Sequence, residues 1–430
     1  MIKSIESKEE FAELVSELRA TTGYVDPIMF GIAKVDLGQK DSDKVLQCQY
    51  PVVNVNENFG SAAIFHYVLE ILSKEEGGVQ ALHQTENELV IRVNDAFIDL
   101  ALQTFSVYAE EAVGDAHKNV QVIRMLAAIK EDVKVKLASE GKEYLGIGKY
   151  NELMYDLTFI YKDAAVETVQ AGYLKLYALS TNKSPLRSLN LDGLFGKLHN
   201  VAWVGNQPIE LDYLRSKEIE LKLTGQYPDI DYVDKFPQFL MHVIPADNTR
   251  ILDTHKVRMG AKISDGTTLM PGASYVNFNA GTEGPCMVEG RISSSVKVGT
   301  GTDIGGGASI LGTLSGGNST PISVGENCLL EVNSVTGIPL GDECIVTAGC
   351  EILAGTKVII SHDEWDKILE VNENACDIKT VCMYDKYQEY LVKAKYISGM
   401  NGMTIRRNSI TGRVEVTRTT RFNTLNPDLH

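Results

Sequence analysis

A six-residue repeat limits what this chain can fold into more than any other feature. From Val257 to Val358 a small aliphatic or similar residue recurs at nearly every sixth position. The repeat positions are Val257, Ile263, Leu269, Tyr275 and, after a one-residue slip, Ile292, Val298, Ile304, Ile310, Ile322, Cys328, Leu340, Val346, Ile352 and Val358. Because Ile310 and Ile322 are two repeats apart, we expect the phase to persist through the glycine-rich stretch between them.

A period of six fits neither an α-helix nor a simple alternating strand. It indicates triangular coils of three short strands, with one aliphatic side chain of each hexad facing inward and small residues at the corners. About seventeen hexads predict roughly five or six coils of a parallel β-helix. The fold alone selects no function, because a β-helix serves equally as a scaffold, an ice-binding surface, a carbonic anhydrase or an acyltransferase.

Composition and charge exclude several classes of protein. The length of 430 residues, with 44% hydrophobic and 23% charged residues, fits two or three globular domains. The sequence contains no run of about eighteen apolar residues and no apolar signal core, so we expect a cytoplasmic protein without a membrane partner. A net charge of −16 argues against a nucleic-acid partner but allows a local cluster of cations to bind a small anion.

The cysteines and histidines predict no disulfide framework and no zinc centre. The seven cysteines include no C-x-x-C pair, and several fall within the repeat, where cysteine serves as a small buried hydrophobic residue. Of the eight histidines only His255 lies at the edge of the repeat, whereas a zinc carbonic anhydrase would need three. Any proton acceptor on the coils should therefore be a carboxylate.

The repeat divides the chain into three predicted domains. Residues 1–245 are expected to form an α/β domain, residues 246–360 the catalytic β-helix, and residues 361–430 a C-terminal extension of a helix and a hairpin. The hairpin should turn near Thr411-Gly412. The extension should fold back on the coils, because the end of a solenoid exposes unpaired strand edges.

The first predicted domain contains both helical and strand-like patterns. Residues 61–75 and 117–138 have helical spacing, whereas residues 89–93 and 219–223 resemble strands. No phosphate-binding loop is present. The region therefore does not indicate a sugar-nucleotide enzyme with a β-helical tail.

The densest glycine segment spans residues 299–318. The spacing of Gly299, Gly301 and Gly305 does not match a dinucleotide-binding loop, and no helix follows. Three consecutive glycines at 305–307 exceed what the corners need, so we expect a bare backbone surface that a ligand can approach closely.

One carboxylate differs from the others in the repeat. The candidates are Asp265, Glu283, Glu289, Asp303, Glu326, Glu331, Asp342, Glu343 and Glu351. Most follow a glycine at a corner, which is typical of a solvated edge. Glu289 instead has apolar neighbours, precedes Gly290-Arg291 and lies where the phase slips. A register break can direct a side chain into a cleft, so Glu289 is the candidate for chemistry.

The motifs VNFNAGT, MVEGRIS, GGGASILGTLSGG and TIRRNSITGRVEV occur in this order. Together they resemble the tetrahydrodipicolinate N-succinyltransferases among the hexapeptide-repeat acyltransferases, in the branch found in actinobacteria and several proteobacteria. The resemblance is dense over residues 257–357 and patchy in the extension. Residues 1–245 resemble the family only in length and α/β character.

The resemblance implies a left-handed parallel β-helix, an exception to the usual crossover hand, and a homotrimer with active sites between subunits. It implies transfer of succinyl from succinyl-CoA, a co-substrate, to the amine of 2-amino-6-oxopimelate, the ring-opened tetrahydrodipicolinate. The products, N-succinyl-2-amino-6-oxopimelate and CoA, belong to lysine and diaminopimelate biosynthesis. No tightly bound cofactor is implied. Two alternatives are another CoA-dependent acyltransferase of small amines, using acetyl, and a non-catalytic β-helical scaffold.

The resemblance also assigns roles to residues. Glu289 corresponds to the family's catalytic glutamate, either a nucleophile that forms an acyl anhydride or a general base, and chemistry favours the base. Gly312 corresponds to a glycine near the reacting carbonyl. The implied CoA contacts are Arg291, Gly306, Ser309, Val332, Thr347, Ala348, Gly355, Lys393, Arg406, Arg407, Asn408 and Ser409. The family has alanine at position 332, so Val332 should contribute only its backbone.

The resemblance does not extend to the metal site of the family. Actinobacterial relatives hold a divalent ion on the trimer axis with two carboxylates, and the corresponding positions here are His255 and Pro271-Gly272. Because Mg²⁺ prefers oxygen ligands, we expect no magnesium site of that kind.

Overall fold

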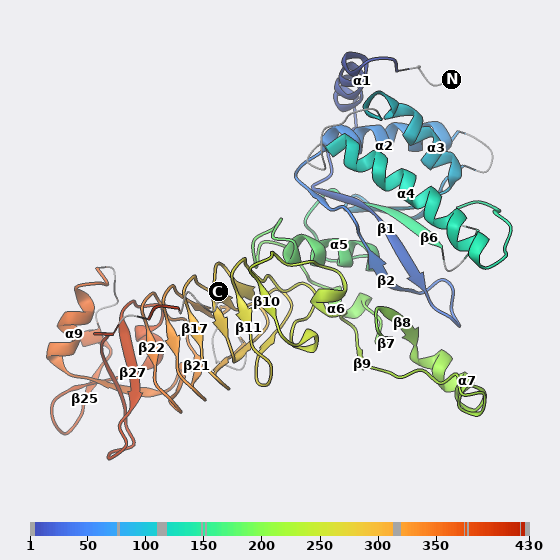
Figure 1. Ribbon diagram of the computed structural model, residues 1–430. Helices are drawn as coiled ribbons and strands as arrows, with labels where there is room; N and C mark the ends of the chain where they lie inside the picture. Colours follow the sequence, from blue (N-terminus) through green and yellow to red (C-terminus); the bar gives the residue numbers. More distant parts are fainter. Residues whose placement is uncertain are drawn as a thin grey trace. The chain divides into compact units, whose positions relative to one another are not determined.

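The computed structural model describes residues 5–74, 78–109, 118–147, 149–150, 153–312, 320–373, 375, 378–421 and 423–425. The chain forms two compact units, one of residues 1–178 with 189–236 and one of residues 179–188 with 237–430 (Figure 1). The three-domain division with boundaries at residues 245 and 360 stays a prediction. None of the helices in the described ranges has the length and apolar character needed to cross a bilayer.

The first unit is built on an antiparallel sheet in the order β2-β1-β6-β5-β4, with β3 also paired to β1. Its strands are β1 (Met29–Leu37), β2 (Val45–Gln49), β3 (Asn54–Val55), β4 (Gln80–Gln84), β5 (Glu88–Arg92) and β6 (Met154–Ile160). Along β6, Leu157 and Phe159 belong to a hydrophobic core, whereas the intervening Thr158 hydroxyl accepts a hydrogen bond from Tyr50. This alternation gives the sheet two buried faces.

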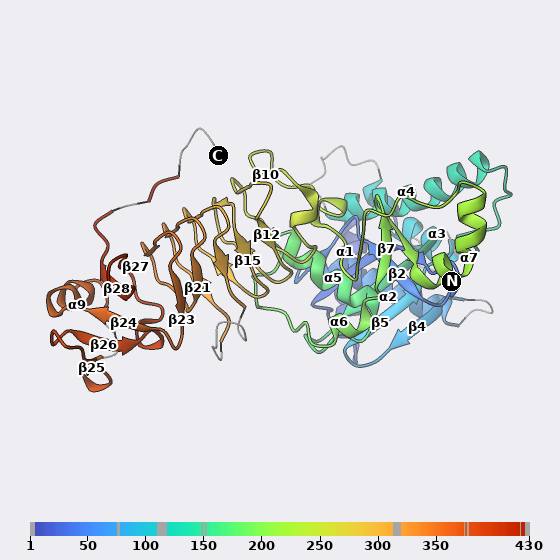
Figure 2. The same cartoon turned by 90° about the horizontal axis from the view of Figure 1, so that it is seen from below.

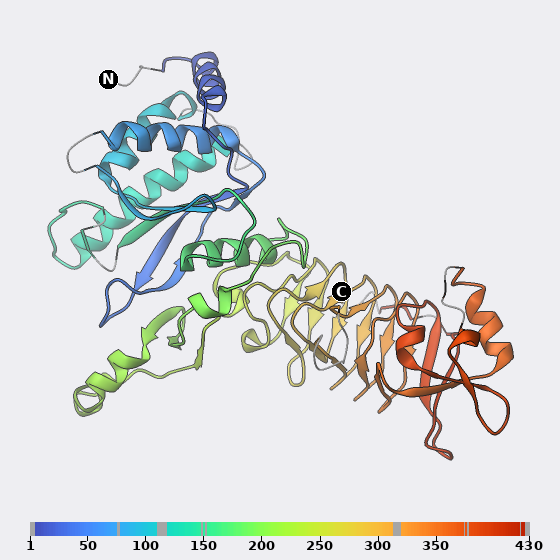
Figure 3. The ribbon, with the colours of Figure 1, turned by 180° about the vertical axis from the view of Figure 1, so that it is seen from behind.

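Helices cover both faces of this sheet. The helices in this part of the chain are α1 (Lys8–Ala20), α2 (Phe59–Leu72), α3 (Asp95–Thr104), α4 (Lys118–Ser139), α5 (Val169–Ser180), α6 (Leu194–Lys197) and α7 (Leu211–Leu223). Figures 1 and 3 show α2, α3 and α4 on one face and α5 on the other. The predicted helices over 61–75 and 117–138 are confirmed as α2 and α4, and the predicted strand over 89–93 as β5.

The prediction of a strand over residues 219–223 is wrong, because these residues form the last turns of α7. Ion pairs spaced three and four residues apart, Lys217 with Glu220 and Lys222 with Glu218, support the helix. The strand was predicted from the apolar residues Ile219 and Leu223. Both side chains are largely exposed on the helix, so they do not belong to a buried strand. The helix follows a small antiparallel sheet of β7 (Val201–Val204), β8 (Gln207–Glu210) and β9 (Tyr232–Asp234).

The second unit contains a parallel β-helix with three faces (Figure 2). The first face stacks β10 (Arg250–Ile251), β11 (Thr268–Leu269), β14 (Met287–Val288), β17 (Asp303–Ile304), β20 (Leu329–Leu330) and β22 (Ile345–Val346). The second face stacks β12 (Tyr275–Val276), β15 (Arg291–Ile292), β18 (Ser309–Ile310), β21 (Val335–Gly337) and β23 (Glu351–Leu353). The third face stacks β13 (Gly281–Thr282), β16 (Lys297–Val298) and β19 (Ser323–Val324).

The hexad residues fill the interior as predicted, with two corrections of phase. Val276, fully buried, faces inward in place of the half-buried Tyr275. The phase also shifts across the glycine-rich stretch, because Val298 pairs with Val324 and not with Ile322. Ile322 is nevertheless buried.

The C-terminal extension folds back on the coils, as predicted. Strand β24 (Lys357–Ile360) leads into the extension, whose elements are α9 (His362–Leu369), β25 (Met383–Tyr384), β26 (Tyr390–Lys393), β27 (Met403–Arg407) and β28 (Val414–Arg418). Strands β27 and β28 form the predicted hairpin, and β27 pairs in parallel with β22. The extension thereby satisfies the backbone edge that the last coil of the first face would otherwise expose.

Candidate active site

Glu289 lies at a shortened corner of the β-helix. The inward residues on its two sides, Val288 and Ile292, are four positions apart, whereas Ile304 and Ile310 on the next coil are six apart. The adjacent Gly290 has no room for a side chain, because a Cβ there would lie 2.3 Å from the carbonyl oxygen of Ala308. The sequence predicted an irregularity of the repeat at Glu289. The structure has one there, because this corner is two residues shorter than the corresponding corner of the next coil.

The Glu289 carboxylate is half-buried and lies over a bare piece of backbone. Its Oε2 atom is 3.5 Å from the point where a Cβ on Gly306 would lie. Three other carboxylates of the repeat have cationic partners: Glu283 with Lys262, Glu331 with Arg421, and Glu343 with Arg418. Across the described ranges no hydrogen bond or ion pair engages the Glu289 carboxylate oxygens. This carboxylate is thus available to accept a proton.

Glu289 starts a row of stacked corners between the first and second faces. Three backbone hydrogen bonds join neighbouring corners: Gly307 N to Glu289 O at 3.2 Å, Asn333 N to Gly306 O at 3.0 Å, and Gly349 N to Val332 O at 3.0 Å. Strand β27 pairs with β22 through Ile345–Thr404 and Val346–Ile405. Continued by two residues, this register sets Arg407 opposite Ala348 as the next position in the row. We name this row, Glu289, Gly306, Val332, Ala348 and Arg407, the corner ladder.

Other predicted site residues flank the corner ladder. Arg291 pairs with Ser309 on the second face, and its Nε and Nη2 donate to the Ser309 hydroxyl at 3.0 and 2.7 Å. Thr347 lies beside Ala348 at the corner that follows β22. Gly312 follows β18, and a Cβ there would lie 3.8 Å from Ser293 Cβ. Residues 313–318 of the predicted glycine segment lie outside the described residues.

A cationic pocket of about 530 Å³ lies at the Arg407 end of the corner ladder. Its lining combines the cations Lys357, Arg407 and Arg413 with the carboxylates Glu351 and Asp385, so its net charge is positive. Arg413 forms an ion pair of 2.9 Å with Asp385. The exposed Lys393 is the cross-strand partner of Lys357. The sequence-based reasoning missed Lys357 and Arg413, because only the pairing of β24, β26 and β28 brings them beside Arg407.

The remaining predicted residues of the hairpin are engaged in its own structure. Arg406 donates to the Glu415 carboxylate from Nε at 3.1 Å and from Nη2 at 2.9 Å. The Asn408 amide nitrogen donates to the same carboxylate at 2.7 Å, and its oxygen accepts from the backbone of the turn. Ser409 is exposed in that turn, and Gly355 is exposed after β23. Arg406 and Asn408 therefore support the turn that presents Arg407.

The residues at the implied metal position do not fit a magnesium site. His255 makes a contact of 3.3 Å from Nδ1 to the Asp253 carboxylate, and Pro271 and Gly272 have no side-chain ligand atoms. Within the described ranges, His83, Glu88 and Glu167 form a cluster with ligand-type spacing. Glu88 accepts hydrogen bonds from Glu167 N and the Thr168 hydroxyl just before α5, so this cluster stabilises the start of a helix.

Comparison with known proteins decides the family. Three family models match: tetrahydrodipicolinate N-succinyltransferase N-terminal over residues 9–196, its middle part over 198–238, and the hexapeptide repeat of succinyl-transferase over 321–354. A 2,3,4,5-tetrahydropyridine-2,6-dicarboxylate N-succinyltransferase of Sulfurovum sp. (strain NBC37-1) is 52% identical over 430 residues, which is 100% of both chains. The chain belongs to the tetrahydrodipicolinate N-succinyltransferase family.

Further relatives support this membership. The enzyme of the same name from Helicobacter pylori is 46% identical and covers 98% of this chain and 99% of its own. A crystal structure from Campylobacter jejuni, provisionally named a 2,3,4,5-tetrahydropyridine-2-carboxylate N-succinyltransferase, is 44% identical with a TM-score of 0.81, over 97% of this chain and 98% of that one. This family member is therefore an acyltransferase with a left-handed β-helix and an N-terminal domain, as predicted.

The family match also extends what the motifs indicated. Residues 9–196 match the N-terminal model of the tetrahydrodipicolinate N-succinyltransferases, although their motifs resembled the family only in length and α/β character. Membership of this family removes the non-catalytic scaffold as an alternative and favours succinyl over acetyl transfer.

Proposed function

We propose that this chain transfers succinyl from succinyl-CoA to the amine of 2-amino-6-oxopimelate, with Glu289 as the general base. The corner ladder carries the proposal, because it joins an unengaged carboxylate to a cationic pocket. Glu289 and Arg407 are separated by four strand spacings of about 4.8 Å, or roughly 19 Å. That span suits an extended pantetheine arm, with the thioester beside Glu289 and the phosphates near Arg407.

The chemistry needs one proton acceptor. The substrate ammonium must lose a proton before its nitrogen attacks the thioester carbonyl, and the Glu289 carboxylate accepts that proton. Attack forms the C–N bond and places negative charge on the carbonyl oxygen. Collapse breaks the C–S bond, and the CoA thiolate takes the second proton from the nitrogen, which leaves a neutral amide and CoA thiol. No step requires a covalent bond to Glu289 or a metal.

The neighbouring residues would bind and orient the donor. Gly306 leaves space beside the carboxylate, where a side chain would contact Oε2. The backbone at Val332 continues the same edge and offers its amide to the pantetheine arm, whereas the Ala348 amide donates to the Glu331 carboxylate at 3.0 Å. Arg291, held by Ser309 next to the ladder, is placed to meet a carboxylate such as the succinyl terminus.

A thiol-release assay tests this function. Free thiol should form with succinyl-CoA when 2-amino-6-oxopimelate is present, much more slowly with acetyl-CoA, and not without an acceptor amine. Equal rates with the two thioesters would contradict succinyl selectivity. Thiol release that does not depend on the acceptor would indicate a hydrolase.

Loss of the cations at the far end of the corner ladder should weaken donor binding. We expect Arg407→Ala and Lys393→Ala each to raise KM for succinyl-CoA about tenfold with little change in kcat, because phosphate contacts stabilise ground and transition states alike. The effect should shrink at high salt. Steady-state kinetics measure it, with Arg215→Ala on the exposed surface of α7 as the control. An unchanged KM in both variants would remove these residues from the site.

We also propose a homotrimer. One chain's coils bury their interior but leave three outer faces, and packing about a three-fold axis would bury one face and form clefts beside Glu289. Light scattering should give three times the mass of 47.2 kDa. A stable monomer with full activity would rule out an active site shared between subunits.

A further inference from the structure

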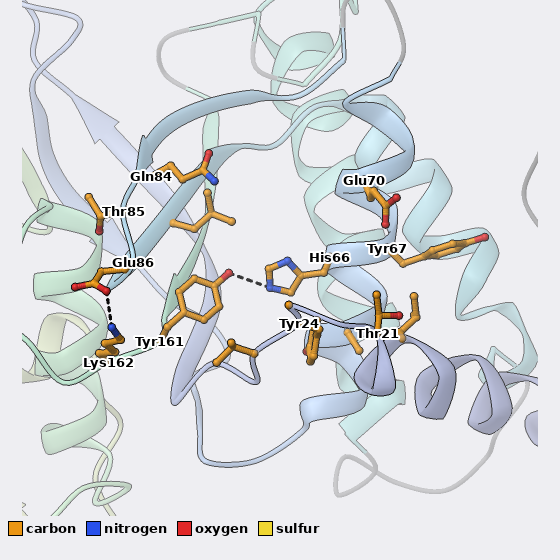
Figure 4. A pocket seen from close by; sticks show the side chains of 15 residues that line it. Thr21, Tyr24, His66, Tyr67, Glu70, Gln84, Thr85, Glu86, Tyr161 and Lys162 are labelled. Carbon is orange, nitrogen blue, oxygen red and sulfur yellow. Dashed lines mark hydrogen bonds and ion pairs between the residues drawn. The ribbon is translucent and has the colours of Figure 1, made fainter.

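A pocket of about 600 Å³ lies within the first unit and contains none of the active-site residues. Figure 4 shows it between the residues of α1 and α2 on one side and the turn after β4 on the other. Its apolar walls include Leu18, Val25 and Leu89, and Val25 remains 58% exposed. A pocket of this size and lining is suited to a small molecule.

The floor of the pocket is aromatic and uncharged. The His66 ring stacks on Phe159 at 4.4 Å between centroids and meets Tyr24 edge-on at 5.5 Å. The Tyr161 hydroxyl lies 3.0 Å from His66 Nε2 (Figure 4). Burial lowers the pKa of His66 to about 4, so its imidazole is neutral at pH 7. Burial also raises the pKa of Tyr24 and Tyr161, so both hydroxyls stay protonated.

One hydroxyl in this floor has an unused hydrogen-bonding capacity. The Tyr24 hydroxyl is shielded from solvent and has no partner at normal hydrogen-bond geometry among the described residues. Burial, followed by the nearby Asp26 carboxylate, raises its pKa. A buried hydroxyl without a partner is costly, and a ligand acceptor that meets it once the Tyr24 side chain turns into the pocket would remove the cost.

The charges around the pocket are already paired. Glu86 and Lys162 form an ion pair of 2.6 Å (Figure 4), and Glu70 pairs with Lys74 at 2.8 Å. With His66 neutral, a charged ligand would find no unpaired counter-ion among the described residues that line the pocket. Burial of a charge without a counter-ion is unfavourable, so the pocket selects uncharged molecules.

We propose that this pocket binds a small uncharged aromatic molecule that carries a hydrogen-bond acceptor. The ring of the ligand packs on the aromatic floor of His66 and Tyr161, and its acceptor receives the Tyr24 hydroxyl proton. The site is separate from the corner ladder in the sequence and in its chemistry. The proposal therefore holds whether or not the succinyl-transfer mechanism is correct.

Three probes of similar size and different charge test the proposal. Benzamide, benzoate and benzylammonium are titrated into the full-length protein at pH 7 and followed by ligand-observed NMR and calorimetry. Benzamide should bind at least about tenfold more tightly than either ion, because each ion loses hydration without gaining a counter-ion. Equal binding of the three probes, preference for an ion, or no binding of benzamide would overturn the proposal.

Two variants locate the binding. Tyr24→Phe keeps the ring and removes the hydroxyl, so benzamide should bind about fivefold more weakly. Thr21→Trp, at an exposed position of the lining, should obstruct the pocket and abolish binding. Tyr227→Phe removes a hydroxyl elsewhere in the same unit and serves as the control. Benzamide binding that is unchanged in both pocket variants would place it elsewhere and sink the proposal.

Discussion

Glu289→Gln should keep the fold and the affinity for succinyl-CoA but lose turnover by about 100- to 10,000-fold. Glutamine preserves the shape of the side chain but cannot accept the ammonium proton. The surroundings should tolerate the change, because within the described residues no donor or cation engages this carboxylate. Single-turnover kinetics and calorimetric titration with succinyl-CoA separate the loss of chemistry from a loss of binding.

The corner carboxylates supply the matched control. Asp342 accepts a hydrogen bond from Glu326 N at 2.8 Å, and Glu343 contacts Arg418 at 4.0 Å, so both have structural roles away from Glu289. Asp342→Asn and Glu343→Gln should retain near-normal rates. If Glu289→Gln also turned over normally, another carboxylate would have to be the base.

Trapping distinguishes the two chemical roles of Glu289. The protein is incubated with labelled succinyl-CoA without the acceptor amine and analysed by mass spectrometry. A general base leaves the protein unlabelled, because no bond to Glu289 forms. A succinyl group recovered on Glu289 would instead establish the acyl-anhydride route.

Ile304→Ala should destabilise the β-helix by about 2–5 kcal/mol, because it removes buried methylene groups and leaves a cavity in a packed interior. Ile304 is fully buried in the first face, between β14 and β20. Urea denaturation at a fixed protomer concentration measures the change in the free energy of unfolding. Ile410→Ala, at a side chain that is 93% exposed, should change it by less than about 0.5 kcal/mol. Equal losses would mean that the hexad interior does not dominate stability.

The hexad pattern predicted the fold well because the residue type at each of its positions depends only on the short strand that contains it. An aliphatic residue at every sixth position is needed wherever a short strand turns its side chain inward, so the pattern survives in the sequence itself. It failed where the backbone leaves the repeat, at Tyr275 and after the glycine-rich stretch. The strand predicted over residues 219–223 was wrong for a different reason. Two exposed apolar residues on a charged helix produced a pattern that resembles a strand.

The prediction of the candidate site was uneven for a related reason. Glu289 was found from a break in a local pattern, and the structure shows that break as a shortened corner. The roles of Arg406 and Arg407 were not separable in the sequence, since the two residues are adjacent at the end of the same strand. In the structure Glu415 engages Arg406, whereas Arg407 lines the cationic pocket.

The sequence by itself determined the β-helix, its interior residues and the unusual position of Glu289, because these depend on neighbours a few residues away. Only the tertiary structure decided which corners stack on one another and what lies at each end of the corner ladder. The pairings of Val346 with Ile405, and of Lys357 with Lys393, join strands that are far apart in the chain. Such pairings are set by the backbone hydrogen bonds of the closing extension, and no local periodicity records them.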